Sequence, residues 1–393
     1  MKKVVFMIIN MNVGGTEKAL LNMISQMPRD KFDISILMLE KYGGFLNKIP
    51  KDVRVNYIEY YEELKYILNN PPQYSALQLI KNKCYIKGIN ILLIHILTKI
   101  IGERNLFYKY VLKDYPDIQE NYDIAVAYAG PMELITYFVL NKIKAKKKVQ
   151  WIHFDVDKCG FNKDASIKNY KMFDKIFVVS DEGKNKLVNK IPELKDKIET
   201  FFNVISPKLI LEQAENDEGF SDEYDGLKIL TVGRLTHEKG QELCIEALKR
   251  LRDDGYNAKW YCIGDGASRN RYEEIVKQKK LEKDFIFLGS KTNPYSYMKQ
   301  CDIYVQPSLH EGYCITLAEA KCFGKAIVTT DFTGAREQII DRMTGIIVDY
   351  NSNNLYMAIK QIIDDYKLRN KISKNVAKTL LDTSSEINKF YKL

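Results

Sequence analysis

Two glutamates on either side of an apolar helix start are the side chains of this sequence best placed to do chemistry. Glu311 precedes the expected helix and Glu319 lies within it, eight residues later. A helix rises about 1.5 Å per residue, so eight residues span roughly 12 Å if the whole stretch is helical. That length matches the reach from a sugar ring, past a diphosphate, to a ribose, and free N–H groups at the helix start suit the diphosphate. The segment therefore fits a nucleotide-sugar, although alone it also fits an amphipathic helix with an exposed glutamate.

Two cations flank a turn that follows another expected strand, at residues 229–232. Arg234 and Lys239 lie five residues apart at the start of a helix. An arginine can bind two phosphate oxygens at once, whereas a lysine adds a mobile point charge. The pair is a candidate for binding a diphosphate. The alternative is that both side chains are solvated surface residues.

Other strand ends carry residues that would let a ligand approach the backbone. They are Gly14 and Gly15 after strand 4–9, Gly233 after strand 229–232, Gly264 after strand 259–263, and Leu288 at the end of strand 285–288. Paired glycines allow a ligand close to the chain. The first turn lacks the GxGxxG spacing of dinucleotide-binding folds, which counts against a dinucleotide. A tight turn without a ligand is the alternative.

A histidine also lies at an expected strand end. His153 follows strand 149–152, at the edge where open α/β sheets bind ligands, so it either faces the cleft or is a structural histidine. Asp155 and Asp157 resemble a DxD metal motif, but no phosphate-binding loop or further carboxylate accompanies them. The remaining histidines show no metal-ligand spacing. We expect no metal site.

The elements that must position these residues alternate between short apolar strands and helices. This alternation predicts two doubly wound, Rossmann-like α/β domains that face each other across a cleft. The acidic, polar residues 212–226 indicate a flexible connector. We therefore expect a first domain at 1–205, a linker at 206–227, a second domain at 228–375, and a C-terminal helix at 376–393 that packs back on the first domain.

Composition limits the partners and the compartment. The 393 residues carry a net charge of +9, but no nucleic-acid recognition motif accompanies it. A dense run, Lys142, Lys144, Lys146, Lys147 and Lys148, suggests contact with an anionic membrane surface. Seven cysteines form no CxxC pair, which favours a reducing cytoplasm. The apolar N-terminus predicts a buried first strand rather than a signal peptide.

The most apolar region, residues 76–101, has two interpretations. Lys87 and Lys99 enclose only eleven residues, too few to span a bilayer. A buried helix is one explanation, and a helix that lies in the headgroup layer of a membrane is the other. The lysines do not fall on one clean face, so the sequence leaves both open.

Taken in order, these motifs resemble the retaining family-4 glycosyltransferases, which have the GT-B fold. The likeness covers nearly the whole chain and is best at 228–350. The resemblance rests on these motifs: Gly14-Gly15-Thr16-Glu17, Trp151-Ile152-His153, Gly233-Arg234 with Lys239-Gly240, the segment 311–319, Gly324-Lys325-Ala326-Ile327-Val328 and Gly334-Ala335-Arg336-Glu337. Cys314 departs from a common glycine or small residue, which leaves the sugar preference open. Ala326 and His237 stand where proline is frequent.

The resemblance implies a role for each candidate. Arg234 and Lys239 would neutralise the donor diphosphate, Glu319 would hold the ribose hydroxyls, and Glu311 would bind the transferred sugar. His153 would lie near the reacting face of the sugar, and Gly15 would border the acceptor and phosphates. The other donor-binding residues would be Gly233, Gly264, Leu288, Gly312, Tyr313, Cys314, Ile315, Thr316 and Leu317. The resemblance implies no essential metal or cofactor, and retention at the anomeric carbon.

The expected activity is hexosyl transfer from a nucleotide-diphosphate sugar to a glycan. The expected acceptor is a lipid-linked intermediate of capsular or other cell-surface polysaccharide, used at the inner face of the cell membrane. One alternative is a GT-B nucleotide-sugar epimerase. Another is a non-catalytic subunit that binds nucleotide-sugar beside a second enzyme.

Overall fold

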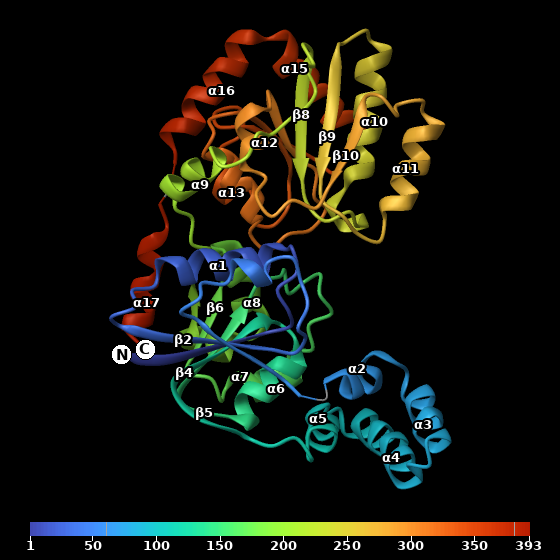
Figure 1. Cartoon of the computed structure of the whole chain (residues 1–393), viewed down its shortest axis with the longest axis vertical. Coiled ribbons are helices and arrows are strands. Elements are labelled where there is room, and N and C mark those ends of the chain that lie inside the picture. The colour runs from blue at the N-terminus through green and yellow to red at the C-terminus, as the bar shows by residue number, and fades with distance from the viewer. Residues whose placement is uncertain (60, 381) are drawn as a thin grey trace.

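The first domain is built on a parallel sheet of seven strands. The structure is a computed structural model that describes residues 1–59, 61–380 and 382–393 (Figure 1). The strand order is β3-β2-β1-β4-β5-β6-β7. The strands are β1 (Lys2–Ile8), β2 (Phe32–Met38), β3 (Arg54–Tyr57), β4 (Ile118–Gly130), β5 (Ile143–Ile152), β6 (Lys175–Val178) and β7 (Ile198–Thr200). The central strand β1 is apolar because helices cover both faces of a parallel sheet.

The helices of this domain fall into two groups. Helix α1 lies directly beneath the second domain in Figure 1, whereas α2 to α5 form a separate lobe beside the sheet. The covering helices are α1 (Gly15–Gln26), α6 (Glu133–Lys142), α7 (Lys163–Tyr170) and α8 (Asp181–Lys190). The helices of the lobe are α2 (Tyr61–Asn69), α3 (Pro72–Lys81), α4 (Tyr85–Ile101) and α5 (Asn105–Val111).

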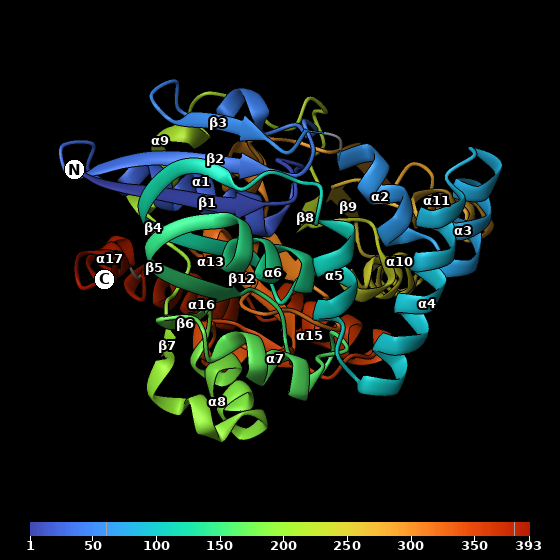
Figure 2. The same cartoon turned by 90° about the horizontal axis from the view of Figure 1, so that it is seen from below.

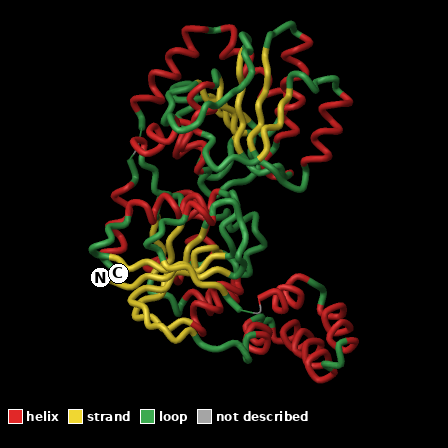
Figure 3. Tube along the Cα trace, in the orientation of Figure 1, coloured by secondary structure: helices red, strands yellow, loops and turns green. Residues whose placement is uncertain are grey.

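The second domain repeats the layered architecture with six parallel strands in the order β10-β9-β8-β11-β12-β13. The strands are β8 (Leu227–Val232), β9 (Ala258–Ile263), β10 (Phe285–Gly289), β11 (Ile303–Gln306), β12 (Ala326–Thr330) and β13 (Ile346–Val348). The helices are α10 (Gln241–Asp253), α11 (Arg269–Gln278), α12 (Tyr295–Gln300), α13 (Ile315–Lys321), α14 (Ala335–Gln338), α15 (Ser352–Asp364) and α16 (Tyr366–Lys378). The prediction of two doubly wound α/β domains is confirmed (Figure 3).

Both sheets reverse their strand order once, and the reversals locate the ligand-binding edge. The first sheet reverses between β1 and β4, and the second between β8 and β11. In open α/β sheets, ligands bind beyond the carboxyl ends of the strands at such a reversal. The residues that follow β1 and β8 are therefore expected to face the cleft.

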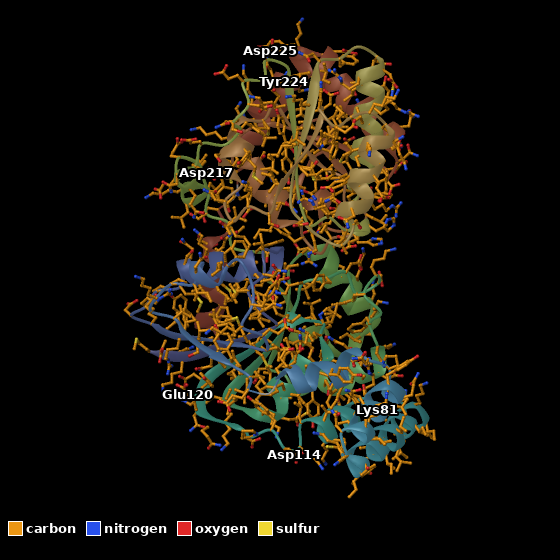
Figure 4. The ribbon with its side chains drawn as sticks, turned by 45° about the vertical axis from the view of Figure 1, so that its right-hand side comes forward. Lys81, Asp114, Glu120, Asp217, Tyr224 and Asp225 are labelled. Atoms are coloured by element: carbon orange, nitrogen blue, oxygen red, sulfur yellow. The ribbon has the colours of Figure 1, made fainter. Side chains whose placement is uncertain are left out.

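The connector between the domains is not a free linker. Its first part is helix α9 (Pro207–Ala214), and residues 217–225 then run along the side of the second domain to its far end (Figure 4). Asp222 accepts hydrogen bonds from Tyr261 (2.6 Å) and Lys259 (3.0 Å), and the Phe220 ring packs on Tyr261. Polar and aromatic residues of the connector thus contact the second domain, while its flexibility stays a prediction.

The chain returns to the first domain at its C-terminal end. Helix α17 (Asn388–Tyr391) places Phe390 in the first core, against Phe6 and Phe177. Upstream, Thr383 donates a hydrogen bond to the Asn203 carbonyl (2.7 Å). Two segments of chain thus join the domains.

The lysine run 142–148 is largely neutralised within its own domain. Lys146 pairs with Asp123 (2.7 Å), Lys147 with Asp174 (3.0 Å), and Lys142 with Asp117 (3.3 Å). Lys148 donates to the Leu140 carbonyl (2.6 Å). Most of this run therefore has partners within its own domain, and its contact with an anionic membrane stays a prediction. Within the described chain, we find no helix both long and apolar enough to cross a membrane.

Candidate functional site

A cavity of about 620 Å³ lies between the two domains. The first domain contributes the segments that follow β1 and β5, together with the start of α1. The second contributes the segments that follow β8, β9, β10 and β11. The candidate catalytic residues His153, Arg234, Lys239 and Glu311 all line it, as does the candidate donor-binding residue Glu319. The fold thus brings together the side chains selected from the sequence, although some of them lie more than 160 residues apart in the chain.

Most of the candidate donor-binding residues line the same cavity. They are Gly15, Gly233, Gly264, Gly312, Tyr313, Cys314, Ile315 and Thr316. Two candidates lie elsewhere. Leu317 is fully buried in the core, and Leu288 packs against that core, whereas Ser290, Lys291 and Thr292 just beyond β10 reach the cavity. The prediction for Leu288 stopped two residues short of the cavity, because the strand end still belongs to the packed sheet.

Glu311 and Lys239 form an ion pair at the cavity wall. The Lys239 Nζ lies 2.5 Å from Glu311 Oε1. Burial would lower the pKa of Lys239, but the Glu311 carboxylate raises it above its usual value, so the ammonium keeps its charge. Ser308 Oγ also donates to Glu311 Oε1 (2.8 Å), and Gln306 donates to Ser308 (2.9 Å). Strand β11 therefore holds the carboxylate in one orientation.

Glu319 is hydrogen-bonded within its own domain and lies near a lysine of the first domain. Its Oε1 accepts a hydrogen bond from Tyr295 (2.7 Å), and the Lys18 ammonium from α1 lies 4.9 Å from the centre of the Tyr295 ring. Burial raises the pKa of Glu319, while Lys18 and the Tyr295 hydroxyl pull it back. Burial likewise lowers the pKa of Lys18, which Glu319 opposes. Lys18 and Tyr295 were not singled out from the sequence.

Arg234 projects from the turn after β8 towards the first domain. Its Nη2 atom lies 3.4 Å from the position that a Cβ on Gly14 would take. The backbone of the turn is fixed independently of the guanidinium, because Gln241 donates to the Arg234 carbonyl (2.9 Å) and Leu235 to the Asp265 carbonyl (3.0 Å). Glu17 also lines the cavity, and burial raises its pKa although Arg234 opposes the shift. The guanidinium thus reaches both walls of the cleft.

His153 is a neutral, buried imidazole. Burial lowers its pKa to about 3, and a hydrogen bond with the Tyr128 backbone opposes the shift. Among the described residues, no hydrogen-bond partner reaches its buried Nε2 atom. A neutral imidazole with a free ring nitrogen is suited to a hydrogen bond with a ligand hydroxyl.

The buried histidine predicts a pH dependence of stability. The folded pKa lies below the ordinary value of 6.5, so folding expels a proton at low pH. Its contribution is complete above pH 6.5 and is lost as the pH falls from there towards 3. Relative to His153→Asn, the wild-type protein should lose about 2 kcal/mol more of its unfolding free energy between pH 7 and pH 5. Denaturant titrations at both pH values measure this, and equal losses would contradict it.

Direct bonds hold the two domains in their closed arrangement. Thr333 Oγ1 donates to the buried Asp155 carboxylate (2.6 Å), which also accepts from Lys186 (2.9 Å). Glu337 accepts from the backbone N–H groups of Asp181 (3.1 Å) and Glu182 (2.6 Å), at the N-terminus of α8. Asp155, set aside as a metal ligand, therefore joins the domains.

The segment before α13 is not helical. Helix α13 spans only seven residues, and residues 311–314 bend before it begins. The length estimated for a continuous helix from Glu311 to Glu319 therefore does not apply. Cys314 has a φ of 57°, in the left-handed region that favours glycine. The glycine common here in the resembling family would adopt this backbone without strain.

The arrangement suits a charged ligand that carries a sugar. Two cations lie near the glycine turns, a fixed carboxylate pairs with one of them, and a second carboxylate lies deeper in the second domain. A diphosphate complements the cations, and carboxylates accept hydrogen bonds from hydroxyl groups. The residues that sequence reasoning missed, such as Lys18 and Tyr295, reach the site only through tertiary packing.

Comparisons with known proteins agree with this arrangement. Residues 213–379 match the family model described as "Glycosyl transferases group 1". Over 185 residues the chain is 35% identical to the N-acetylgalactosamine-N,N'-diacetylbacillosaminyl-diphospho-undecaprenol 4-alpha-N-acetylgalactosaminyltransferase of Campylobacter jejuni, covering 47% of this chain and 48% of that protein. It is 26% identical to the capsular polysaccharide biosynthesis glycosyltransferase CapM of Staphylococcus aureus, covering 51% and 55%. The matches thus span about half the length of these curated relatives.

Likeness to solved structures extends over the whole chain. The structure of Anabaena HepE in complex with UDP-glucose aligns with 100% of this chain and 99% of its own, with a TM-score of 0.71 and 15% identity. Staphylococcus aureus TarM aligns with a TM-score of 0.68, over 100% and 98%, at 14% identity. At these identities the likeness establishes the fold, which is the expected GT-B arrangement.

Proposed function

Because residues 213–379 match the model of the group 1 glycosyltransferases, we propose that the chain moves a hexose or related sugar from a nucleotide-diphosphate donor to a glycan acceptor. One observation carries the proposal: Arg234, Lys239, Glu311 and Glu319 line a single cavity between the two domains. Its volume of about 620 Å³ falls within the roughly 300–1,000 Å³ usual for small-molecule sites.

The proposed roles follow the charges that develop during transfer. The bond between the anomeric carbon and the diphosphate oxygen breaks as a bond to an acceptor hydroxyl forms. Positive charge grows on the sugar and negative charge on the departing diphosphate. Arg234 and Lys239 would stabilise that diphosphate, since preorganised cations act most strongly where water is excluded. Glu311 would bind the transferred sugar, and Glu319 the ribose hydroxyls.

His153 is the remaining residue of the proposed site. The neutral His153 imidazole would accept a hydrogen bond from a hydroxyl of the transferred sugar.

We propose retention at the anomeric carbon, by attack on the face from which the diphosphate departs, with the proton of the acceptor hydroxyl passing to the leaving diphosphate. Two fixed cations are proposed to serve in place of an essential metal.

For the acceptor we propose a lipid-linked glycan of cell-surface polysaccharide assembly, used at the cytoplasmic face of the membrane. Two relatives support this choice through their names, which specify an undecaprenol-linked substrate for one and capsular polysaccharide for the other. The similarity to each covers about half of the chain.

Ligand-induced stabilisation tests the donor assignment. One of the UDP-, GDP- or ADP-sugars should stabilise the protein by about 2.7 kcal/mol at a hundred times its Kd. Glu319→Gln keeps the acceptor for Tyr295 but removes the charge offered to the ribose, so its response should shrink. The matched control, Glu282→Gln, changes an exposed residue of the same domain. Thermal melts with each sugar measure this, and a protein that no nucleotide-sugar stabilises would contradict the proposal.

Product analysis separates transfer from the alternatives. Transfer requires an acceptor and gives a product whose anomeric configuration, read by NMR, matches the donor. Free sugar of changed ring configuration, released with nucleotide and with no acceptor dependence, would indicate an epimerase. Donor binding without even slow donor hydrolysis would indicate a non-catalytic subunit.

A further inference from the structure

Among the described residues, those of the helical lobe α2–α5 do not line the cleft, yet the lobe carries an unusual surface. It lies between β3 and β4 in the chain and projects beside the first sheet in both views (Figures 1 and 2). Helices α3 and α4 pack together, and Ile67, Ile91 and Val111 form a small core of their own. Tyr108 ties the lobe to the domain through the Tyr137 ring.

Helix α4 is apolar on two opposite faces. The inner face buries Gly88, Ile91 and Thr98 against the lobe. At 100° per residue, the exposed residues centre on the opposite side of the helix. They are Ile86, Ile89, Leu93, Ile96, Leu97, Ile100 and Ile101, which are 48–78% exposed. A contiguous apolar face of this kind marks an interaction surface, unlike apolar residues scattered singly.

The neighbouring helix extends this surface. Tyr74 and Leu77 of α3 are 60% and 55% exposed. We call the exposed apolar residues of α3 and α4 the apolar face of the lobe. Of the two interpretations of residues 76–101, a buried helix applies to one side of α4 only. The other side is exposed, so a helix that lies in the headgroup layer stays open.

The charges within α3 and α4, which form the apolar face, have one sign, and Glu103, which follows α4, pairs with Lys168 (2.6 Å). From Leu64 to Gly102 the sequence contains no Asp or Glu, but it contains five lysines. Lys81 and Lys83 lie exposed at the turn between α3 and α4, and Lys99 is exposed near the other end of α4 (Figure 4 labels Lys81). An apolar face bordered by lysines complements acyl chains bordered by anionic headgroups.

We propose that the apolar face of the lobe docks the protein on an anionic lipid bilayer. The isoleucines and leucines of α4 would enter the headgroup–acyl boundary, while Lys81, Lys83 and Lys99 contact anionic headgroups. A second copy of this chain is the weaker partner, because its face would bring the same positive charge. We assign the docking to this surface and not to the lysine run 142–148, most of whose lysines pair within their own domain. The inference rests on the proposed function only in one respect: a lipid-linked acceptor would explain why the protein binds a membrane.

Vesicle flotation tests the proposal with the full chain. Wild-type protein should float with vesicles that contain phosphatidylglycerol and bind phosphatidylcholine vesicles more weakly. Ile89→Glu with Leu93→Glu should reduce the partition coefficient at least tenfold, since each change removes an apolar anchor and adds repulsion. The matched control is Ile340→Glu with Met343→Glu, which changes residues 53% and 50% exposed on the second domain and should float like wild type.

A second variant isolates the charges. Lys81→Gln with Lys83→Gln should weaken binding to anionic vesicles only. Unchanged flotation of the Ile89/Leu93 variant would overturn the proposal. So would a dimer, seen by sedimentation equilibrium, that the variant abolishes while lipid binding persists. The donor-induced thermal shift should be unchanged in all these variants, so failure of the docking surface and failure of the proposed function give different results.

Discussion

Arg234→Ala should lower turnover by at least about two orders of magnitude while the protein stays folded. The guanidinium lines the cleft and reaches Gly14 on the opposite wall, where the proposed diphosphate departs. An interaction made mainly in the transition state contributes about 2.7–4 kcal/mol, by analogy with oxyanion-hole donors. The fold should survive because Gln241 and Asp265 bond the backbone of the turn, which the substitution leaves in place. Transfer assays at saturating donor measure the effect.

Two further variants serve as controls for the Arg234→Ala assay. Arg271→Ala is the matched control, since Arg271 is exposed and pairs only with Glu242 (2.7 Å) within the described structure. A surface pair of this kind contributes about 0–1 kcal/mol, so turnover should be unaffected. Arg234→Lys keeps the charge but loses the two-pronged geometry and should give an intermediate rate. Near wild-type turnover in folded Arg234→Ala would remove Arg234 from the proposed mechanism.

Most of the strands could be predicted because the buried part of a parallel strand is largely apolar. Strand β1 and its counterpart β8 both show this pattern, and each ends in a glycine-containing turn. The short strands β3 and β7 were missed, since Arg54–Tyr57 and Ile198–Thr200 carry too few apolar residues for periodicity to reveal them. Their place in the sheet comes from pairing with β2 and β6.

The site could be predicted where chemistry follows a strand end, and not where it depends on a distant partner. Arg234 and Glu311 follow strands of one sheet, so the fold class alone places them near one edge. Lys18 reaches Tyr295 across 277 positions of sequence, and Thr333 reaches Asp155 across 178. No local pattern encodes such contacts. The partners of the lysine run could not be predicted for the same reason, since the carboxylates that pair with it come from other segments.

Domain closure connects these contacts to the proposed chemistry. The residues that line the cleft come from both domains, so their mutual distances depend on the bonds between the domains. Ser180 Oγ donates to the Gly312 carbonyl (2.9 Å), directly beside Glu311. This bond between the domains therefore lies next to the carboxylate proposed to bind the sugar.

Gly312→Ala should lower turnover by roughly a hundredfold because it wedges the domains apart. A Cβ on Gly312 would collide with the backbone carbonyl of His153, well inside the 3.0 Å that real Cβ atoms keep from other atoms. Relief requires a shift of about 1 Å between Glu311 and His153, and a misplacement of that size can cost about 10²-fold in rate. Turnover and the radius of gyration from X-ray scattering should change together.

Gly15→Ala separates this wedge from the general effect of adding a methyl group. A Cβ there meets only Ile315 Cγ2, at an ordinary 3.5 Å, although Gly15 lines the same cavity. Its radius of gyration should therefore match that of the wild-type protein, whereas that of Gly312→Ala should be larger. If Gly312→Ala keeps both the compact shape and the wild-type rate, the contact between Gly312 and His153 does not set the geometry of the cleft. Closure would then have to depend on other contacts between the domains, such as the bonds of Asp155 and Glu337.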